Sequence, residues 1–210
     1  MRAVILAAGA VHDYERLHPL VGKPDLVICA DGGIAHAAPL GLSPSLILGD
    51  FDSADAGLLT KLASRGTPVQ RVPVEKDSTD THLALNEAVS RGATEVLLVG
   101  GAGSRLDHTL ANILLLPGYA TPVTMADGKN IARLLRSGER LVLQGREGEY
   151  ISLLPLTPTV TGVVAEGVKW PLASATLRWG ESLGVSNQFA GPTARVRIDE
   201  GALLVVQAWD

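Results

Sequence analysis

The chain has 210 residues, enough for one large domain or two small ones, and 46% of them are hydrophobic, which suffices for a substantial core. The net charge of −4 at pH 7 gives no general electrostatic surface for DNA or RNA, so we expect no nucleic-acid partner. Cys29 is the single cysteine, which excludes a disulfide within the chain and a cysteine-rich zinc site, and its apolar surroundings predict burial.

The first part of the chain alternates short apolar runs with helical patterns. Residues 3–8 (AVILAA) are too short to cross a bilayer and are typical of a strand that runs into a glycine turn, not of a signal peptide. We therefore expect a cytoplasmic protein without a membrane partner. Similar runs predict further buried strands at 26–30, 46–49, 70–75, 96–101 and 122–126. Apolar residues at helical spacing predict helices between them at 56–66, 81–92 and 106–118.

The pattern changes in the last third of the chain, where long helical patterns are scarce. Short strand candidates divided by Gly, Pro or Ser-Asn follow one another at 140–145, 150–156, 160–167, 175–180, 194–199 and 202–209. Strands at this spacing are typical of a sandwich or barrel. We predict an α/β domain with a doubly wound, mainly parallel sheet at 1–130, followed by an all-β sandwich at 131–210.

Acidic and glycine-rich segments follow the predicted strands of the first domain. Asp31 comes directly after residues 26–30, and Asp50 and Asp52 come after 46–49. The segments that follow the next two strands contain Lys76, Asp77, Thr79 and Asp80, and then Gly101, Arg105, Asp107 and His108. Because the carboxyl ends of parallel strands lie along one edge of a sheet, we expect these residues to converge on one crevice.

Crowded carboxylates repel one another unless a cation is present, and Mg²⁺ is a cation that takes oxygen ligands. If the strand ends at Asp50, the side chains of Asp50 and Asp52 point the same way and Phe51 points into the core. Arg105 would clamp phosphate oxygens, and Asp80 or Asp107 would orient or deprotonate an attacking hydroxyl. Acids, metal and phosphate together predict phosphoryl-type transfer.

Each of these acidic residues also has a purely structural interpretation. Asp52 or Ser53 could cap the helix at 56–66, and Ser78 or Thr79 could cap the next helix. Asp31 could be a turn residue before two glycines. A helix cap needs one acceptor, however, whereas GDFDS and KDSTD each offer several, and this favours the functional interpretation.

Other functional classes lack their motifs. No lysine is followed by Ser or Thr, so a Walker A loop is absent. Leu106 stands where the dinucleotide fingerprint requires its third glycine, which disfavours a NAD-dependent oxidoreductase. A non-catalytic module that only binds a nucleotide or thiamine remains an alternative, but binding a polyanion alone would favour basic residues over acids.

The motifs DGG, LGDFDS, KDSTDTHLAL, GGAGSRLDHTLANILLL, YISLLPL, GVKWPL and GVSNQF occur in this order. In this respect the chain resembles the thiamine pyrophosphokinase (thiamine diphosphokinase) family over nearly its whole length. The resemblance implies an α/β domain, a β-sandwich domain and a homodimer with active sites between subunits. It also implies that ATP donates its β,γ-pyrophosphate to the hydroxyl of thiamine, giving thiamine diphosphate and AMP, with Mg²⁺ required.

By position in these motifs, the catalytic residues would be Asp50, Asp52, Asp80, Arg105 and Asp107. The Mg²⁺ ligands would be Asp50, Asp52 and Asp80. The ATP-binding residues would be Asp31, Gly32, Lys76, Asp77, Thr79, Gly101, Arg105 and His108. Ser186 and Asn187 would approach thiamine from the partner subunit, and Phe189 would stack on its rings, because an aromatic face favours a cation.

Two positions depart from the family pattern. His82 stands where many relatives carry an acid, and Trp170 replaces a common tyrosine and is expected to pack in the sandwich. A close alternative is the same transfer to another hydroxymethyl heterocycle, such as a pterin, because residue spacing alone does not identify the acceptor.

Overall fold

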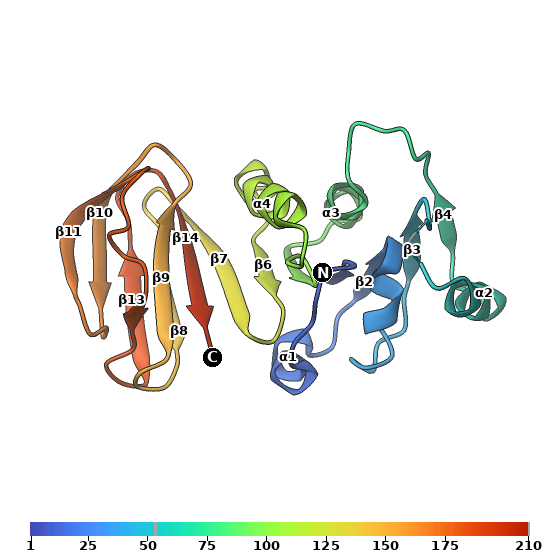
Figure 1. Cartoon of the computed structure of the whole chain (residues 1–210), viewed down its shortest axis with the longest axis horizontal. Helices are drawn as coiled ribbons and strands as arrows, with labels where there is room; N and C mark the ends of the chain where they lie inside the picture. The colour runs from blue at the N-terminus through green and yellow to red at the C-terminus, as the bar shows by residue number, and fades with distance from the viewer. Residues whose placement is uncertain (53, 210) are drawn as a thin grey trace. The chain divides into compact units, whose positions relative to one another are not determined.

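The computed structural model describes residues 1–52 and 54–209, which fall into two compact units, Met1–Gly128 and Lys129–Asp210 (Figure 1). The first unit is α/β and the second is all-β, which confirms the predicted fold class. Ser53, considered above as a helix cap, lies outside the described residues.

The first unit contains a parallel sheet with the strand order β6-β5-β1-β2-β3-β4. Its strands are β1 (Arg2–Leu6), β2 (Leu26–Ala30), β3 (Leu46–Gly49), β4 (Val69–Arg71), β5 (Glu95–Val99) and β6 (Val123–Ala126). β4 is much shorter than the run predicted at 70–75, and the chain from 72 to 79 is a loop. The order reverses between β1 and β5, and ligands bind at such a switch point in open α/β sheets.

Helices cover both faces of this sheet. They are α1 (Tyr14–Val21), α2 (Ala56–Ser64), α3 (Asp80–Ser90) and α4 (Leu106–Leu115), with short 3-10 helices η1 (Asp31–His36) and η2 (Leu116–Gly118). Figure 1 shows α1 and α2 on one side of the strands and α3 and α4 on the other. This is the arrangement that right-handed crossovers produce when the strand order reverses.

Side-chain caps start three of these helices. Asp13, Asp55 and Thr79 accept hydrogen bonds from the backbone amides of residues 16, 58 and 82 at the starts of α1, α2 and α3. Thr79 was one of the two predicted caps for its helix, whereas Asp55 replaces the predicted Asp52. α1 was not predicted from the sequence, because Pro19 lies inside it and proline normally interrupts a helical pattern.

Except for the exposed edge strand β4, the strands of the first unit are buried along almost their whole length. Every residue of β2 and β3 is buried, as is all of β1 and β5 after the first residue. Strands covered on both faces require such continuous apolar sequences. Cys29 lies among them as predicted, and burial raises the pKa of its thiol to about 12.

α2 packs more loosely than the other helices of this unit, since none of its described residues is buried. A cavity of about 460 Å³ lies beside it, lined by residues of η1, of the segment before β3 and of α2 itself. Ile34, Leu58 and Leu62 are among the apolar residues of its wall. α2 begins only a few residues after Asp52, so the loosely packed helix directly follows the acidic segment.

The second unit consists of two antiparallel sheets with the strand orders β12-β9-β14-β7 and β11-β10-β13-β8. The first sheet contains β7 (Asn130–Arg136), β9 (Tyr150–Pro155), β12 (Asn187–Gln188) and β14 (Ala202–Ala208). The second contains β8 (Arg140–Gln144), β10 (Thr159–Glu166), β11 (Leu172–Arg178) and β13 (Thr193–Arg197).

One apolar core joins the two sheets of the second unit. Alternate residues of β9 and β14, such as Ile151, Leu153, Leu203 and Val205, contribute to it from the first sheet. Val196 contributes to it from β13 in the second sheet. Alternation of buried and exposed residues is typical of a sandwich in which each sheet has one inner face. No helix among the described residues has the length and apolar character needed to cross a membrane.

We predict that Gly33→Ala destabilises the first unit. A Cβ atom at Gly33 would lie 1.9 Å from the carbonyl oxygen of Leu6, so η1 would be pushed away from the end of β1. Overpacking of this kind typically costs about 1–3 kcal/mol, measurable as a lower urea midpoint. Gly118→Ala is the matched control, because no heavy atom lies within 4 Å of the Cβ position there. Equal midpoints for the two variants would contradict the close approach of η1 to β1.

Candidate functional site

A cleft of about 460 Å³ lies at the carboxyl ends of the parallel strands in the first unit. The predicted residues that line it are Asp31, Asp50, Asp52, Thr79, Asp80, Gly101, Arg105 and His108. Residues after β1 and β5, the two strands on either side of the switch point, form part of its wall. These are Ala7, Ala8, Gly9, Gly100, Ala102, Gly103 and Ser104. The structure therefore brings together most of the predicted residues of the first domain.

Three carboxylates form one cluster inside this cleft. Asp31, Asp50 and Asp52 each have an oxygen within 4.8 Å of an oxygen from the other two. Asp31 is buried, Asp50 is half-buried and Asp52 is exposed, so the cluster runs from the sheet edge toward solvent. An all-oxygen donor set of this kind suits a hard divalent cation.

The backbone around the cluster is unusual at two residues. Asp31 has φ 48° and Phe51 has φ 66°, in the left-handed region that costs energy for residues other than glycine. A Cβ atom on Gly49 would lie 3.0 Å from the Cα atom of Asp31, so a larger residue would crowd the cluster.

The prediction that Phe51 points into the core is wrong. The left-handed turn at Phe51 takes its ring out of the extended path, and the ring lies partly exposed under the Arg71 guanidinium, 5.1 Å from its centroid. Asp50 and Asp52 are brought together by this turn and not by continued strand geometry. The backbone amide of Asp52 donates a hydrogen bond of 3.2 Å to Asp50 Oδ1.

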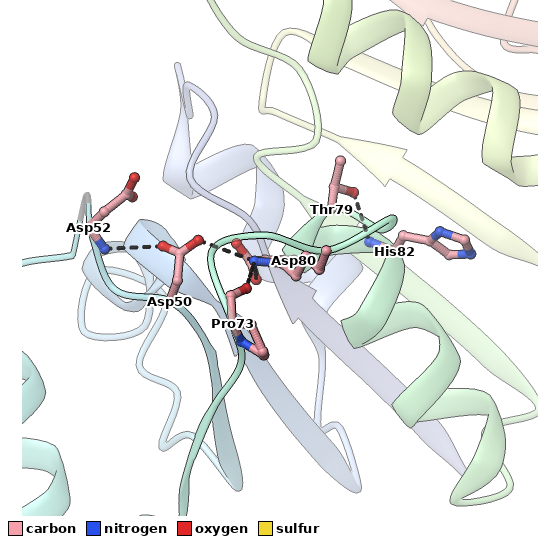
Figure 2. A network of polar contacts seen from close by, with 7 residues as sticks. Asp50, Asp52, Pro73, Thr79, Asp80 and His82 are labelled. Atoms are coloured by element: carbon pink, nitrogen blue, oxygen red, sulfur yellow. Dashed lines mark hydrogen bonds and ion pairs between the residues drawn. The ribbon is translucent and has the colours of Figure 1, made fainter.

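Lys76 links two of the acidic residues. Its ammonium donates to Asp50 Oδ2 at 3.1 Å and to the Pro73 carbonyl at 3.0 Å, and forms an ion pair of 3.2 Å with Asp80 Oδ1. Figure 2 shows Asp50 and Asp80 facing one another, with Asp52 on the outer side of Asp50. Asp80 was predicted as a metal ligand, but in this structure it lies across the ammonium from Asp50 and outside the three-carboxylate cluster.

The pKa values of Asp50, Asp80 and Lys76 do not all shift in the same direction. The Asp52 amide and the Lys76 ammonium lower the pKa of Asp50, whereas burial raises the pKa of Asp80 despite the ion pair. Burial alone would lower the pKa of Lys76, but its contacts with both carboxylates outweigh burial and raise it. Asp50 is therefore the better metal ligand of the pair, and Asp80 is the better acceptor of a proton.

Arg105 forms an exposed pair with Asp107 at the start of α4. Its guanidinium donates to both carboxylate oxygens, at 3.2 and 2.6 Å. Arg105 lowers the pKa of Asp107 to about 2, which makes this carboxylate a poor general base near neutral pH. The described residues that line the cleft include Arg105 and His108 but not Asp107.

Lys76 and Asp77 belong to a neighbouring depression of about 280 Å³, which shares Thr79, Asp80 and His108 with the cleft. Gly32 lies in η1 beside Asp31. It is not one of the described residues that line the cleft or the neighbouring depression.

Two residues that hold the cleft walls in place were not predicted from the sequence. Buried Asn112 on α4 donates from Nδ2 to the carbonyl of Gly101 at 2.7 Å. His36 donates from Nε2 to the carbonyl of Gly9 at 2.9 Å, which leaves Nδ1 to accept from the Tyr14 hydroxyl at 2.8 Å. A single polar residue within the apolar run 110–116 (LANILLL) was the available signal for Asn112.

In the second unit, Asn187 uses its side chain to hold a neighbouring loop. Its Oδ1 accepts from the amides of Trp170 and Gln188 at 3.0 and 2.9 Å, and its Nδ2 donates to the carbonyl of Trp170 at 2.7 Å. The side chain of Asn187 is therefore engaged with neighbouring backbone in this structure. Ser186, which precedes it, has φ 58° and an exposed side chain.

Trp170, expected to pack in the sandwich, is instead 54% exposed. Its backbone is fixed by Asn187, and the Lys169 ammonium lies 4.7 Å from the centroid of its ring. The backbone of Trp170 is thus held in place while its indole is exposed, which differs from the packing expected from the sequence.

Phe189, the residue predicted to stack on thiamine, is 1% exposed and belongs to the core of the second unit. A Cβ atom on Gly145 would lie 2.8 Å from its ring, so the ring is packed directly against the backbone there. Because neither face of the ring is accessible, we correct the predicted role of Phe189 from ligand stacking to core packing.

Comparison with known proteins agrees with the two-unit organisation. Residues 17–124 match the family profile described as thiamin pyrophosphokinase, catalytic domain, and residues 139–203 match thiamin pyrophosphokinase, vitamin B1 binding domain. The chain belongs to the thiamine pyrophosphokinase family. This confirms the resemblance inferred from the seven motifs.

Relatives in the family match over most of their length. A thiamine pyrophosphokinase from Bacillus subtilis is 26% identical over 209 residues, covering 98% of each chain. Thiamine pyrophosphokinase 2 from Arabidopsis thaliana is 26% identical and covers 91% of this chain and 81% of the relative. The crystal structure of a thiamin pyrophosphokinase from Geobacillus thermodenitrificans has a TM-score of 0.85 and 28% identity, covering 100% of this chain and 98% of that one.

We predict that Phe189→Ala destabilises the second unit by about 3–5 kcal/mol, because it removes a fully buried ring from a packed core. All three tryptophans, Trp170, Trp179 and Trp209, lie in this unit, so their fluorescence during urea denaturation reports its unfolding. Phe51→Ala, in the other unit, is the matched control and should shift this transition far less. An unchanged transition in Phe189→Ala would restore a surface role for the ring.

Proposed function

We propose that this chain is a thiamine diphosphokinase, which transfers the β,γ-pyrophosphate of ATP to the hydroxyl of thiamine and releases AMP. The observation that supports the proposal is that Asp31, Asp50, Asp52, Asp80 and Arg105 all line one cleft of this chain. The chain also belongs to the thiamine pyrophosphokinase family. Catalysis of such transfers consists mainly of positioning the phosphates and neutralising their charge.

Asp31, Asp50 and Asp52 are the residues that fit Mg²⁺. They supply oxygen ligands only, they come from the ends of neighbouring strands, and the buried Asp31 anchors the cluster to the sheet. When bound there, the ion would neutralise charge on the transferring phosphates. This set replaces Asp80 of the predicted ligands with Asp31, which had been assigned to the nucleotide side.

The remaining cleft residues divide between phosphate and acceptor. Arg105 and His108 at the start of α4 would bind phosphate oxygens, and the glycine turns after β1 and β5 leave room for the phosphates beside the backbone. Asp80, whose pKa burial raises, would accept the proton of the thiamine hydroxyl. Asp107 would act through Arg105, whose guanidinium it holds in place.

For thiamine we propose binding by the second unit, through the exposed indole of Trp170 and the hydroxyl of Ser186. The thiazolium ring is a cation, and an indole face attracts a cation by about 0.5–2 kcal/mol. Asn187 would contribute by fixing the backbone of Trp170. We assign ATP and Mg²⁺ binding to residues 1–130 and thiamine binding to 131–210.

We also propose that the chain forms a cytoplasmic homodimer with active sites between subunits. Leu106, Leu110 and Leu114 recur every four residues on α4 and are 68%, 49% and 65% exposed, which leaves one apolar face of this helix uncovered. The second unit exposes further large apolar side chains, at Trp179, Leu183 and Val185. A second copy of the chain would cover such surfaces.

The test of the function is AMP release that depends on thiamine. The protein with ATP and Mg²⁺ should release AMP when thiamine is added, and Asp52→Asn should lose most of this turnover at saturating Mg²⁺ while remaining folded. Asp55→Asn is the matched control, because Asp55 caps α2 and lies outside the acid cluster. AMP formed with a hydroxymethyl pterin and not with thiamine would reject the proposal.

For the dimer, we predict that the wild-type protein has twice the mass of one chain at assay concentration and that Leu110→Glu is a monomer of low activity. Ala63→Glu changes an exposed position on α2 and should leave the mass unchanged. Mixing Asp52→Asn with Trp170→Ala chains should restore activity, because one site of each mixed dimer would then be intact. A fully active monomer would rule out a site shared between subunits.

A further inference from the structure

The ammonium of Lys76 lies between two acidic residues of the cleft. It donates hydrogen bonds to Asp50 and to the carbonyl of Pro73, and it forms an ion pair with Asp80 Oδ1, a buried oxygen that has no hydrogen-bond partner among the described residues. The three side chains of the ion pairs are largely covered, with exposed fractions of 15% for Lys76, 12% for Asp50 and 20% for Asp80. This cation is therefore held between residues of the cleft, from the neighbouring depression, and is not a freely exposed surface lysine.

Asp50 takes part in two groups at once. Its carboxylate belongs to the cluster with Asp31 and Asp52, and its Oδ2 atom is also bound by Lys76. A carboxylate that already neutralises one cation attracts a second cation less strongly. Lys76 and a divalent cation therefore compete for the negative charge of Asp50.

We propose that Lys76 is a resident counter-cation, which keeps the affinity of the acid cluster for a divalent metal alone low and turns to the polyphosphate when nucleotide binds. The proposal rests on the proposed function, since it needs a nucleotide substrate. Before binding, Lys76 offsets the repulsion between Asp50 and Asp80. With nucleotide present, the phosphate oxygens give its ammonium an anionic partner, and Asp50 becomes available for metal ligation. Metal and nucleotide would thus favour each other's binding.

The first measurement is the dissociation constant of Mn²⁺ in the absence of nucleotide and thiamine, from the electron paramagnetic resonance signal of free Mn²⁺. Lys76→Met should bind Mn²⁺ more tightly than the wild type by about 5- to 150-fold, the range typical of coupled binding sites. Lys76→Arg keeps the positive charge and should stay close to the wild type. Lys61→Met, which removes a charge from α2 outside the cluster, should leave the constant unchanged.

The second measurement is the affinity for a non-hydrolysable ATP analogue at saturating Mn²⁺. Here Lys76→Met should bind more weakly than the wild type, because the phosphates lose a cationic partner. Opposite changes for metal and nucleotide are specific to competition. A purely structural ion pair would weaken both affinities or neither, and either of these results would overturn the proposal.

Folding of the variants is checked by circular dichroism and by urea denaturation. If Lys76→Met does not fold, Lys76→Gln carries the same test, because its amide still donates to one carboxylate without adding charge. Mn²⁺ binding is measured without thiamine or AMP, so its outcome is independent of thiamine-dependent AMP release. Unchanged Mn²⁺ affinity in a folded neutral variant would overturn the role of Lys76 and leave the proposed function intact.

Discussion

Repulsion between carboxylates at the ends of parallel strands is the constraint around which this cleft is arranged. Because β1, β2, β3 and β5 run in the same direction, the residues that follow them share one edge, and Asp31 and Asp50 meet there. Asp80 adds a further charge from the start of α3. The apolar strands beneath supply the stability that holds these charges together, and Lys76 offsets part of the repulsion.

The two units support binding in different ways. In the first, glycine turns and two side-chain hydrogen bonds, from Asn112 and His36, fix the backbone that surrounds the cleft. In the second, the side chain of Asn187 forms hydrogen bonds with neighbouring backbone, and the exposed groups beside it are Trp170 and Ser186. Rigid buried groups thus position a few exposed ones, as binding sites require.

The sequence predicted the convergence of the acids, because uninterrupted apolar runs identify buried parallel strands and their ends identify one edge. It did not predict how the chain turns after a strand. Nothing in GDFDS indicates that Phe51 adopts a left-handed conformation. α1 was not predicted because Pro19 lies inside it. Motif position also does not say which way a side chain faces, so Phe189 was assigned to a ligand although it lies in the core.

The loose packing of α2 has a consequence for the acidic segment that precedes it. A helix without a buried side chain exposes little new apolar surface when it opens, so its local unfolding costs a small part of the global stability. Amide protons of α2 should therefore exchange with solvent much sooner than those of β3, although only a few residues separate the two elements. The segment with Asp50 and Asp52 thus joins a fully buried strand to a helix that has no buried residue among those described.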